Sequence, residues 1–191
     1  MLILNSGANS GIGYETAISL ATACTISVIR VDITNKETIN ATKENINLKF
    51  GKLNVLINNA GISHPLLRKS VNPYIIYISS ALGSVTLRLD PDREHREIRS
   101  DTCRMSKSAL NMLAACQRYN YAEWGCNVLA FNPGWCISNR TGESGREIRS
   151  KGGARSPKEP AIALVDIVLG KRDDDVEKNG MLDLDGGILP W

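Results

Sequence analysis

The sequence has few of the features that mark a membrane, secreted or nucleic-acid-binding protein. Aromatic residues make up 5% of its 191 residues, there is no CxxC pair among five cysteines, and no apolar run is long enough to span a bilayer. The odd cysteine number and an N-terminus without a basic leader predict reduced thiols in a cytoplasmic protein. His64 and His95 have no Cys or His partner at ligand spacing, so we expect no metal site.

The charge pattern argues against a nucleic-acid partner. The net charge is only +3, and basic residues are interleaved with acidic ones, as in DPDREHREIRSD (90–101). The few aromatic residues are not spaced for base stacking. We therefore expect neither nucleic acid nor a membrane as a partner.

Short apolar runs alternate with helical stretches along the chain. Expected strands cover 2–4, 25–33, 54–61, 74–80, 127–134 and 180–187, and expected helices cover 11–23, 102–123 and 157–169. A further helix is expected to be capped by Thr34 or Asn35, to run to about Phe50 and to end at Gly51. In the helix over 102–123, one side gathers Met105, Ala109, Met112 and Cys116. The polar, glycine-rich stretch 139–156 is expected to be a mobile loop. The alternation predicts an α/β protein with a parallel sheet covered on both faces, and without a repeat or linker we expect one domain over 1–191.

A glycine-rich turn connects the first expected strand to the first expected helix. The segment SGANSGIG (6–13) places Gly7 where the chain must turn, and Gly11 and Gly13 where the backbone can approach a ligand. The start of the following helix offers free N–H groups to phosphate. Glycine turns are common by themselves, but in this strand–turn–helix setting the segment predicts dinucleotide binding.

Five motifs occur in the order expected of one family: the G-x-x-x-G-x-G turn, NNAG (58–61), ISSALG (78–83), a helix with Ser106 and Lys107, and NPG (132–134). The set resembles the short-chain dehydrogenase/reductase family, most closely its carbonyl-reductase or C-factor-like branch. This resemblance covers nearly the whole chain. It implies a Rossmann-like, doubly wound parallel sheet in three α/β/α layers, an NAD(P) cofactor and a carbonyl or alcohol substrate.

The resemblance assigns cofactor-binding roles by position. The phosphate turn corresponds to Gly7, Asn9, Gly11, Ile12 and Gly13. Asp32 and Ile33 correspond to the strand end that contacts adenine, and Asn59, Ala60 and Gly61 to the wall beside the adenosine ribose. The turn beside the nicotinamide corresponds to Pro133 and Gly134, followed by Cys136 and Ser138 near the carboxamide.

The same resemblance assigns the catalytic roles. Ser80 corresponds to the catalytic serine, and Lys107 to the lysine that also binds the cofactor ribose. Cys103 stands where the family has its catalytic tyrosine. A cysteine side chain is several ångströms shorter than tyrosine, whereas a proton donor must come within about 2.6–3.2 Å of its acceptor. We therefore expect weak or absent reductase activity.

Less specific interpretations remain for the single motifs. NNAG can be a plain strand-ending turn and Asp32 a neighbour of a helix cap. Ser80 can be an ordinary strand-end hydroxyl, and Lys107 a solvated helix lysine. The agreement of five motifs in order favours the family interpretation.

Two parts of the family pattern are short in this chain. Only 12 residues, 62–73, connect the expected strands at 54–61 and 74–80, and the family's asparagine-bearing helix has no counterpart there. A strand and helix are also missing before Asp32, unless 25–33 is itself the second strand and Asp32 the ribose-binding acid. We expect a truncated family member, from altered splicing, gene prediction or gene decay, with exposed apolar sheet surface and a weakened case for a homo-oligomer.

Three functions are compatible with the sequence. The first is an NAD(P)-dependent oxidoreductase with impaired activity. The second is an inactive nucleotide-binding protein with a regulatory or interaction role. The third is an enzyme with Cys103 as its nucleophile, which would need His64 or His95 as a base.

Overall fold

The computed structural model spans residues 1–191 and describes 1–22, 27–32, 34–58, 66–93, 99–138 and 142–191. Within these residues one sheet contains β1 (Ile3–Asn5), β2 (Val55–Asn58), β3 (Tyr74–Ile78), β4 (Asn127–Asn132), β5 (Met181–Asp183) and β6 (Ile188–Leu189). The strands lie side by side in the order of the sequence. The first five are parallel, and β6 pairs antiparallel with β5.

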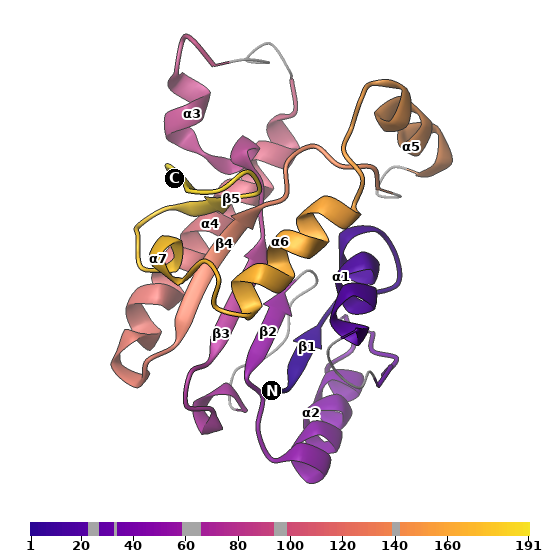
Figure 1. Cartoon of the computed structure of the whole chain (residues 1–191), viewed down its shortest axis with the longest axis vertical. Helices are drawn as coiled ribbons and strands as arrows, with labels where there is room; N and C mark the ends of the chain where they lie inside the picture. Colours follow the sequence, from indigo (N-terminus) through magenta and orange to yellow (C-terminus); the bar gives the residue numbers. More distant parts are fainter. Residues whose placement is uncertain (23–26, 33, 59–65, 94–98, 139–141) are drawn as a thin grey trace.

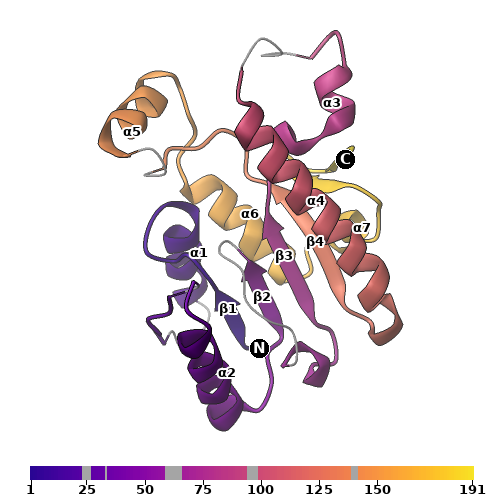
Figure 2. The ribbon, with the colours of Figure 1, turned by 180° about the vertical axis from the view of Figure 1, so that it is seen from behind.

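Helices cover both faces of this sheet. They are α1 (Gly11–Ala21), α2 (Lys36–Phe50), α3 (Val85–Leu89), α4 (Asp101–Tyr121), α5 (Gly142–Lys151), α6 (Lys158–Val168) and α7 (Asp173–Val176), with 3-10 turns η1 (Leu67–Lys69), η2 (Ala81–Gly83) and η3 (Ala122–Trp124). Figure 1 shows α1 and α6 over one face, and Figure 2 shows α2 and α4 over the other. The predicted Rossmann-like, three-layer α/β class is confirmed.

A separate apolar core fills the space on each face. Leu20 of α1 and Leu164 of α6 pack with Ile76 and Phe131 of the sheet on one side. On the other side, the core contains Ile46 of α2, Ala114 of α4 and inward side chains of β2, β3 and β4. The strands β3 and β4 are therefore buried on both faces, as their near-continuous apolar sequence predicts.

The ends of α2 follow from its sequence. The Asn35 side chain accepts a hydrogen bond from the Glu37 amide at 2.8 Å, and this bond caps the helix start. Gly51 ends the helix in the left-handed conformation, with φ 73°. The predicted helix end at Phe50, before Gly51, is confirmed, and of the two predicted caps, Thr34 and Asn35, it is Asn35 that caps the helix.

The strand predicted over 25–33 is wrong for 27–32, which contain no strand. Val28 is 93% exposed, whereas a strand of a parallel sheet would be buried by helices on both faces. Its β-branched residues favour a strand locally, but the chain before α2 is too short to supply the helix that would cover it. Within the described residues β1 therefore forms one edge of the sheet.

The short link between β2 and β3 does not expose the sheet at these strands. In its described part, from residue 66 onward, the only regular structure is η1. Leu66 and Leu67 are buried in the same cluster as Leu56 and Ile75, which are themselves fully buried. The expectation of an uncovered sheet face is therefore wrong at this position, because two loop leucines supply the apolar cover of a helix.

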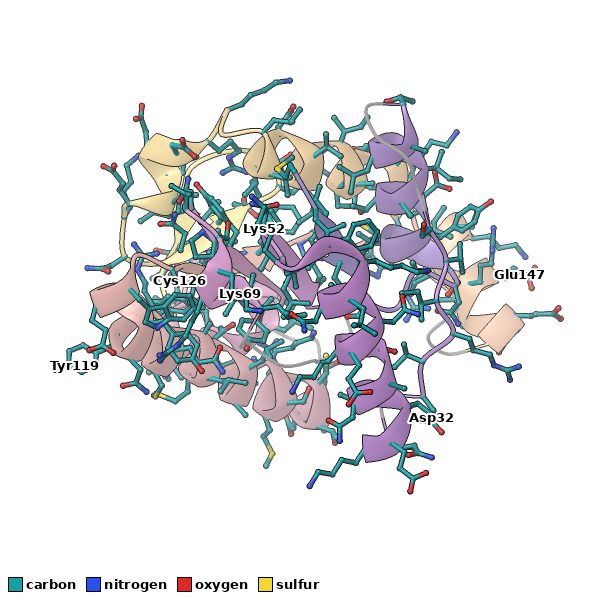
Figure 3. All side chains as sticks on the ribbon, turned by 90° about the horizontal axis from the view of Figure 1, so that it is seen from below. Asp32, Lys52, Lys69, Tyr119, Cys126 and Glu147 are labelled. Carbon is teal, nitrogen blue, oxygen red and sulfur yellow. The ribbon has the colours of Figure 1, made fainter. Side chains whose placement is uncertain are left out.

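The apolar stripe of α4 faces away from the sheet. Met105 is 72% exposed and Met112 is 65% exposed, with Ala109 and Cys116 on the same outer side. Tyr119, one turn beyond Cys116, also points outward from α4 (Figure 3). The buried side of α4 instead contains Asn111 and Ala114.

Candidate functional site

The glycine turn leaves the start of α1 open to a ligand. Gly7 and Gly11 have φ of 68° and 59°, a region that residues with a Cβ seldom adopt. Ser10 forms no side-chain capping bond, and the first turn of α1 contains no acidic residue. The first N–H groups of the helix therefore remain available, and the helix dipole favours an anion there.

A cavity of about 490 Å³ lies beside this helix start. One wall comes from the glycine turn and the first turns of α1: Asn9, Ser10, Gly11, Tyr14 and Glu15. The other comes from the chain after β4 and around α5 and α6: Ile137, Ser138, Arg146, Ser156 and Pro157. Of the predicted cofactor residues, the cavity thus brings Asn9, Gly11 and Ser138 together from distant parts of the chain.

Gly13 connects the first helix to the first strand. The Asn5 side chain donates a hydrogen bond of 2.7 Å to the Gly13 carbonyl, and Gly13 is buried. This contact packs α1 against the end of β1, as expected for the last glycine of the turn. Ile12 follows the same turn and packs against the core beneath α1.

Ser80 and the ammonium group of Lys107 both lie at the C-terminal end of β3. The Lys107 ammonium donates a hydrogen bond of 2.7 Å to the Ile78 carbonyl, two residues before Ser80. The Ser80 hydroxyl accepts a bond of 3.2 Å from the Leu82 amide and caps η2. Ser108, next to Lys107, donates to the Gly83 carbonyl at 2.8 Å. The strand end, η2 and the first turns of α4 therefore hold the two predicted catalytic residues close together.

Cys103 lies one helical turn before Lys107 on α4. It is a half-buried free thiol, and residues four positions apart on a helix share a face. The thiol therefore lies on the side of α4 that Lys107 occupies. The histidines that a Cys103 nucleophile would need, His64 and His95, lie outside the described residues.

The PGW turn after β4 points Cys136 inward. Gly134 has φ 69°, and the Cys136 thiol donates to the Pro133 carbonyl at 2.9 Å. Burial raises the pKa of this thiol to about 11, against an ordinary value of 9.0, with a smaller contribution from Glu159. Cys136 is therefore a packed thiol beneath the turn, whereas Ser138 reaches the cavity.

Asp32 lies at the periphery, beside the start of α2 (Figure 3). Its carboxylate accepts bonds from the Thr34 hydroxyl at 2.7 Å and the Thr34 amide at 2.9 Å, and these bonds lower the pKa of the carboxyl. This geometry fits the alternative role of a neighbour to a helix cap, and Asp32 is not among the cavity residues. The other residues predicted on the adenosine side, Ile33, Asn59, Ala60 and Gly61, lie outside the described residues.

Sequence reasoning missed part of the site. The cavity residues Arg146 and Ser156 come from the stretch 139–156, which was expected to be a loop but contains α5. Asn132 was also missed: its side chain accepts from the Ala81 amide at 2.9 Å and donates to Asp183 at 2.7 Å. It ties η2 to the ends of β4 and β5, and its place just before Pro133 was the available signal.

Known proteins resemble the chain in sequence over most of its length. A family profile described as enoyl-(acyl carrier protein) reductase matches residues 8–74. Short-chain dehydrogenase anuI of Penicillium roqueforti is 26% identical, over 86% of this chain and 93% of its own. Short-chain dehydrogenase/reductase tropE of Talaromyces stipitatus is also 26% identical, over 99% of this chain and 97% of its own.

The alignment with tropE also shows where the chain differs from its relatives. It runs over 267 positions, whereas this chain has 191 residues, so at least 76 positions have no counterpart here. Because the alignment covers nearly the whole length of both proteins, the missing positions are internal. The expected shortening relative to the family is therefore confirmed.

Solved structures share the fold. NADPH-bound carbonyl reductase from chicken fatty liver matches with a TM-score of 0.77 and 21% identity, over 100% of this chain and 98% of its own. Ligand-free aldohexose dehydrogenase of Thermoplasma acidophilum matches with a TM-score of 0.65 and 19% identity, over 86% and 85%. The ordered motifs and the relatives in sequence support membership of the short-chain dehydrogenase/reductase family, and these structural matches show the shared fold.

Proposed function

We propose that residues 1–191 form one NAD(P)-binding domain of a cytoplasmic oxidoreductase with impaired activity on a carbonyl or alcohol substrate. The observation that carries the proposal is the cavity, which brings the glycine turn and Ser138 together at the start of α1. No helix among the described residues is both long and apolar enough to cross a membrane. The proposal also assigns the chain to the carbonyl-reductase-like branch of the short-chain dehydrogenase/reductase family.

The residues at the open start of α1 fit the phosphates of such a cofactor. Gly11 has no atom within 4 Å of an added Cβ, so its backbone faces open space. Hydroxyl groups of Ser10, Ser138 and Ser156 line the same cavity and can donate hydrogen bonds to phosphate oxygens. When bound, the reduced nicotinamide supplies a hydride to the substrate carbonyl carbon.

The protein must orient the substrate carbonyl and give its oxygen a proton. In the proposed site the Ser80 hydroxyl donates a hydrogen bond to that oxygen. Lys107, held at the end of β3 by its bond to Ile78, orients the cofactor ribose and keeps positive charge beside the proton donor. In the reverse direction the same groups accept the alcohol proton.

Cys103 is the weak element of this arrangement. Its thiol lies on the turn of α4 before Lys107, where the resemblance expects the tyrosine, but the side chain lacks the phenol ring and is therefore much shorter. A proton must then pass through a bridging water, which is less well positioned than a direct donor. We therefore expect cofactor binding with slow turnover. If turnover is absent, the same site supports the second function, an inactive nucleotide-binding protein.

A titration followed by an assay tests the proposal. The purified chain is titrated with NAD(H) and NADP(H) in a thermal-shift experiment, and consumption of NADPH or NADH is then measured with simple ketones. A dose-dependent rise in melting temperature supports the cofactor site, because a ligand that binds only the folded state stabilises it. Binding with slow turnover supports the oxidoreductase, binding without turnover supports the regulatory alternative, and the absence of binding contradicts both.

A further inference from the structure

The candidate cavity contains a cation that the motif pattern does not assign. Among the lining residues that the structure describes, only Arg146 and Glu15 carry a charge. Glu15 is on the wall formed by α1, and Arg146 is on α5, in the opposite wall. The remaining polar groups are hydroxyls, one amide and the backbone at the start of α1.

The segment that contains Arg146 is held at its two ends, which we call its neck, by contacts among Trp135, Ile137 and Arg155. The Arg155 amide donates to the Trp135 carbonyl at 3.0 Å, and the Ile137 amide donates to the Arg155 carbonyl at 3.0 Å. The Arg155 guanidinium binds Asp185 through two nitrogens, at 2.5 and 2.8 Å. The backbone bonds pair the two ends of this segment with each other, and the Asp185 contact joins Arg155 to the turn after β5.

The helix itself rests on Trp135. A Cβ on Gly152 would lie 2.6 Å from the Trp135 ring, so the absence of a side chain at Gly152 permits this contact. Figures 1 and 2 show α5 at the end of the molecule where α1 begins. The neck and this contact thus place an exposed arginine opposite the glycine turn.

We propose that Arg146 is the cationic ligand of the cofactor pyrophosphate. The inference rests on the proposed function, because it concerns the same site. A guanidinium binds phosphate oxygens by charge-assisted, often bidentate, hydrogen bonds. The pyrophosphate lies at the start of the first helix in dinucleotide-binding folds. In this chain Ser10 and Gly11, at the start of α1, line the cavity. Arg146 would complete the anion site from the side opposite to α1.

The pyrophosphate, rather than the 2′-phosphate of NADP, is the expected partner. A 2′-phosphate belongs to the adenosine ribose, whose partners in these folds follow the second strand. The described residues before α2, 27–32 with Asp32 among them, do not line the cavity. Since NAD and NADP share the pyrophosphate, loss of Arg146 should weaken both cofactors equally.

Isothermal titration calorimetry of NAD⁺ and NADP⁺ tests the inference. Arg146→Gln should raise both dissociation constants about tenfold, the effect of losing one charge-assisted bond. Arg146→Lys, which keeps the charge without the planar fork, should lie between wild type and Arg146→Gln. Lys151→Gln is the matched control, since Lys151 is on the same helix, pairs with Glu147 at 2.7 Å and lies outside the cavity lining. It should change neither constant more than about twofold.

The salt dependence of the same titrations is a second readout. Removing a phosphate-binding cation should lessen the loss of affinity between low and high salt in Arg146→Gln relative to wild type. Glu15→Gln should strengthen the binding of both cofactors, because it removes the one negative side chain among the described lining residues. Circular dichroism checks that each variant is folded.

The outcomes separate the inference from the function on which it rests. Wild type and Arg146→Gln with equal affinities for both cofactors would overturn the role of Arg146 and leave the proposed function intact. Loss of NADP⁺ affinity alone would overturn the pyrophosphate assignment and place Arg146 at the 2′-phosphate. A folded wild-type chain that binds neither cofactor would overturn both.

Discussion

A Cβ placed on Gly83 would lie 2.6 Å from the carbonyl carbon of Lys107 and 2.8 Å from its Cβ. Gly83 therefore sets how closely η2 can approach α4. Through η2 it also sets the distance between Ser80 and Lys107, because Ser80 caps that turn. A real Cβ contact is never this short, so a side chain at Gly83 must push the two elements apart.

Gly83→Ala should destabilise the fold by about 1–3 kcal/mol, the usual cost of overpacking a tight contact. It should also weaken cofactor binding, because Lys107 moves away from the end of β3. Urea unfolding and cofactor titration measure the two effects. Ser108→Ala is the comparison, since it removes the 2.8 Å bond to the Gly83 carbonyl without adding bulk. A Gly83→Ala chain as stable as wild type would show that the contact is looser than the structure has it.

Cys103→Tyr should increase carbonyl reduction by about 10²-fold or more, in the range typical of a positioned general acid. The reason is reach, since the phenol extends the proton donor toward the end of β3. The assay is NADPH and NADH consumption with simple ketones. Cys116→Tyr provides the control, because Cys116 is an exposed thiol on the outer stripe of α4. If Cys103→Tyr reacts no faster than wild type, the missing tyrosine does not limit activity.

The four described cysteines should react with a thiol reagent in two classes. Burial raises the pKa of Cys126 to about 12 and that of Cys136 to about 11, so both are protonated at neutral pH. Only the thiolate reacts, and both thiols are also shielded. The fifth cysteine, Cys24, lies outside the described residues and is replaced by serine for this experiment. In the Cys24→Ser chain we expect Cys103 and Cys116 to react first at pH 8. Fast labelling of Cys136 in the folded chain would contradict its inward position.

The stability of the chain should fall on acidification partly through Asp175. Hydrogen bonds from Arg172 and then Lys178 lower the pKa of this carboxyl from its ordinary 3.8. The folded state therefore binds the proton less readily than the unfolded state. This contribution is present above the unfolded pKa and is lost as pH falls through the folded value.

The matching measurement is the melting temperature of wild type and Asp175→Asn between pH 7 and pH 2. Arg172 also donates to the Asp183 and Gly187 carbonyls, at 2.7 and 3.0 Å, so the pair connects α7 to the turn after β5. The difference in melting temperature between wild type and variant should shrink below about pH 4, where the carboxyl becomes protonated in the unfolded state. If this difference in melting temperature stays constant from pH 7 to pH 2, the charge of Asp175 is not its cause.

Local signals in the sequence predicted the elements that their own residues determine. Asn35 and Gly51 marked the ends of α2 because capping is a property of a few neighbouring residues. The glycine turn was likewise placed correctly at the start of α1. The strand predicted over 25–33 was wrong for 27–32, because a buried strand needs covering helices and the chain before α2 is too short to supply one.

The parts of the site that were missed depend on tertiary contacts. Leu66 and Leu67 gave no sign that they would cover β2 and β3 in place of a helix. Arg146 lies in a charged, glycine-rich run that favours a loop, and the ends of this run are held by contacts of Arg155 with Trp135 and with Asp185, which local patterns do not reveal. Periodicity also grouped Met105 with Met112 correctly, but could not tell that their side of α4 faces outward.

The central claim is that the start of α1 binds the phosphates of NAD(P), and the pair Gly11→Asp and Gly11→Asn tests it most directly. A Cβ added at Gly11 meets no atom within 4 Å, and both substitutions require the same positive φ, so the two variants differ essentially in one charge. The measurement is the fluorescence of NADPH and NADH during titration with each folded chain. We predict saturable binding of at least one of the two cofactors to wild type, weaker binding to Gly11→Asn and none to Gly11→Asp. Equal affinities of Gly11→Asp and Gly11→Asn, or a folded wild type that binds neither cofactor, would contradict the account.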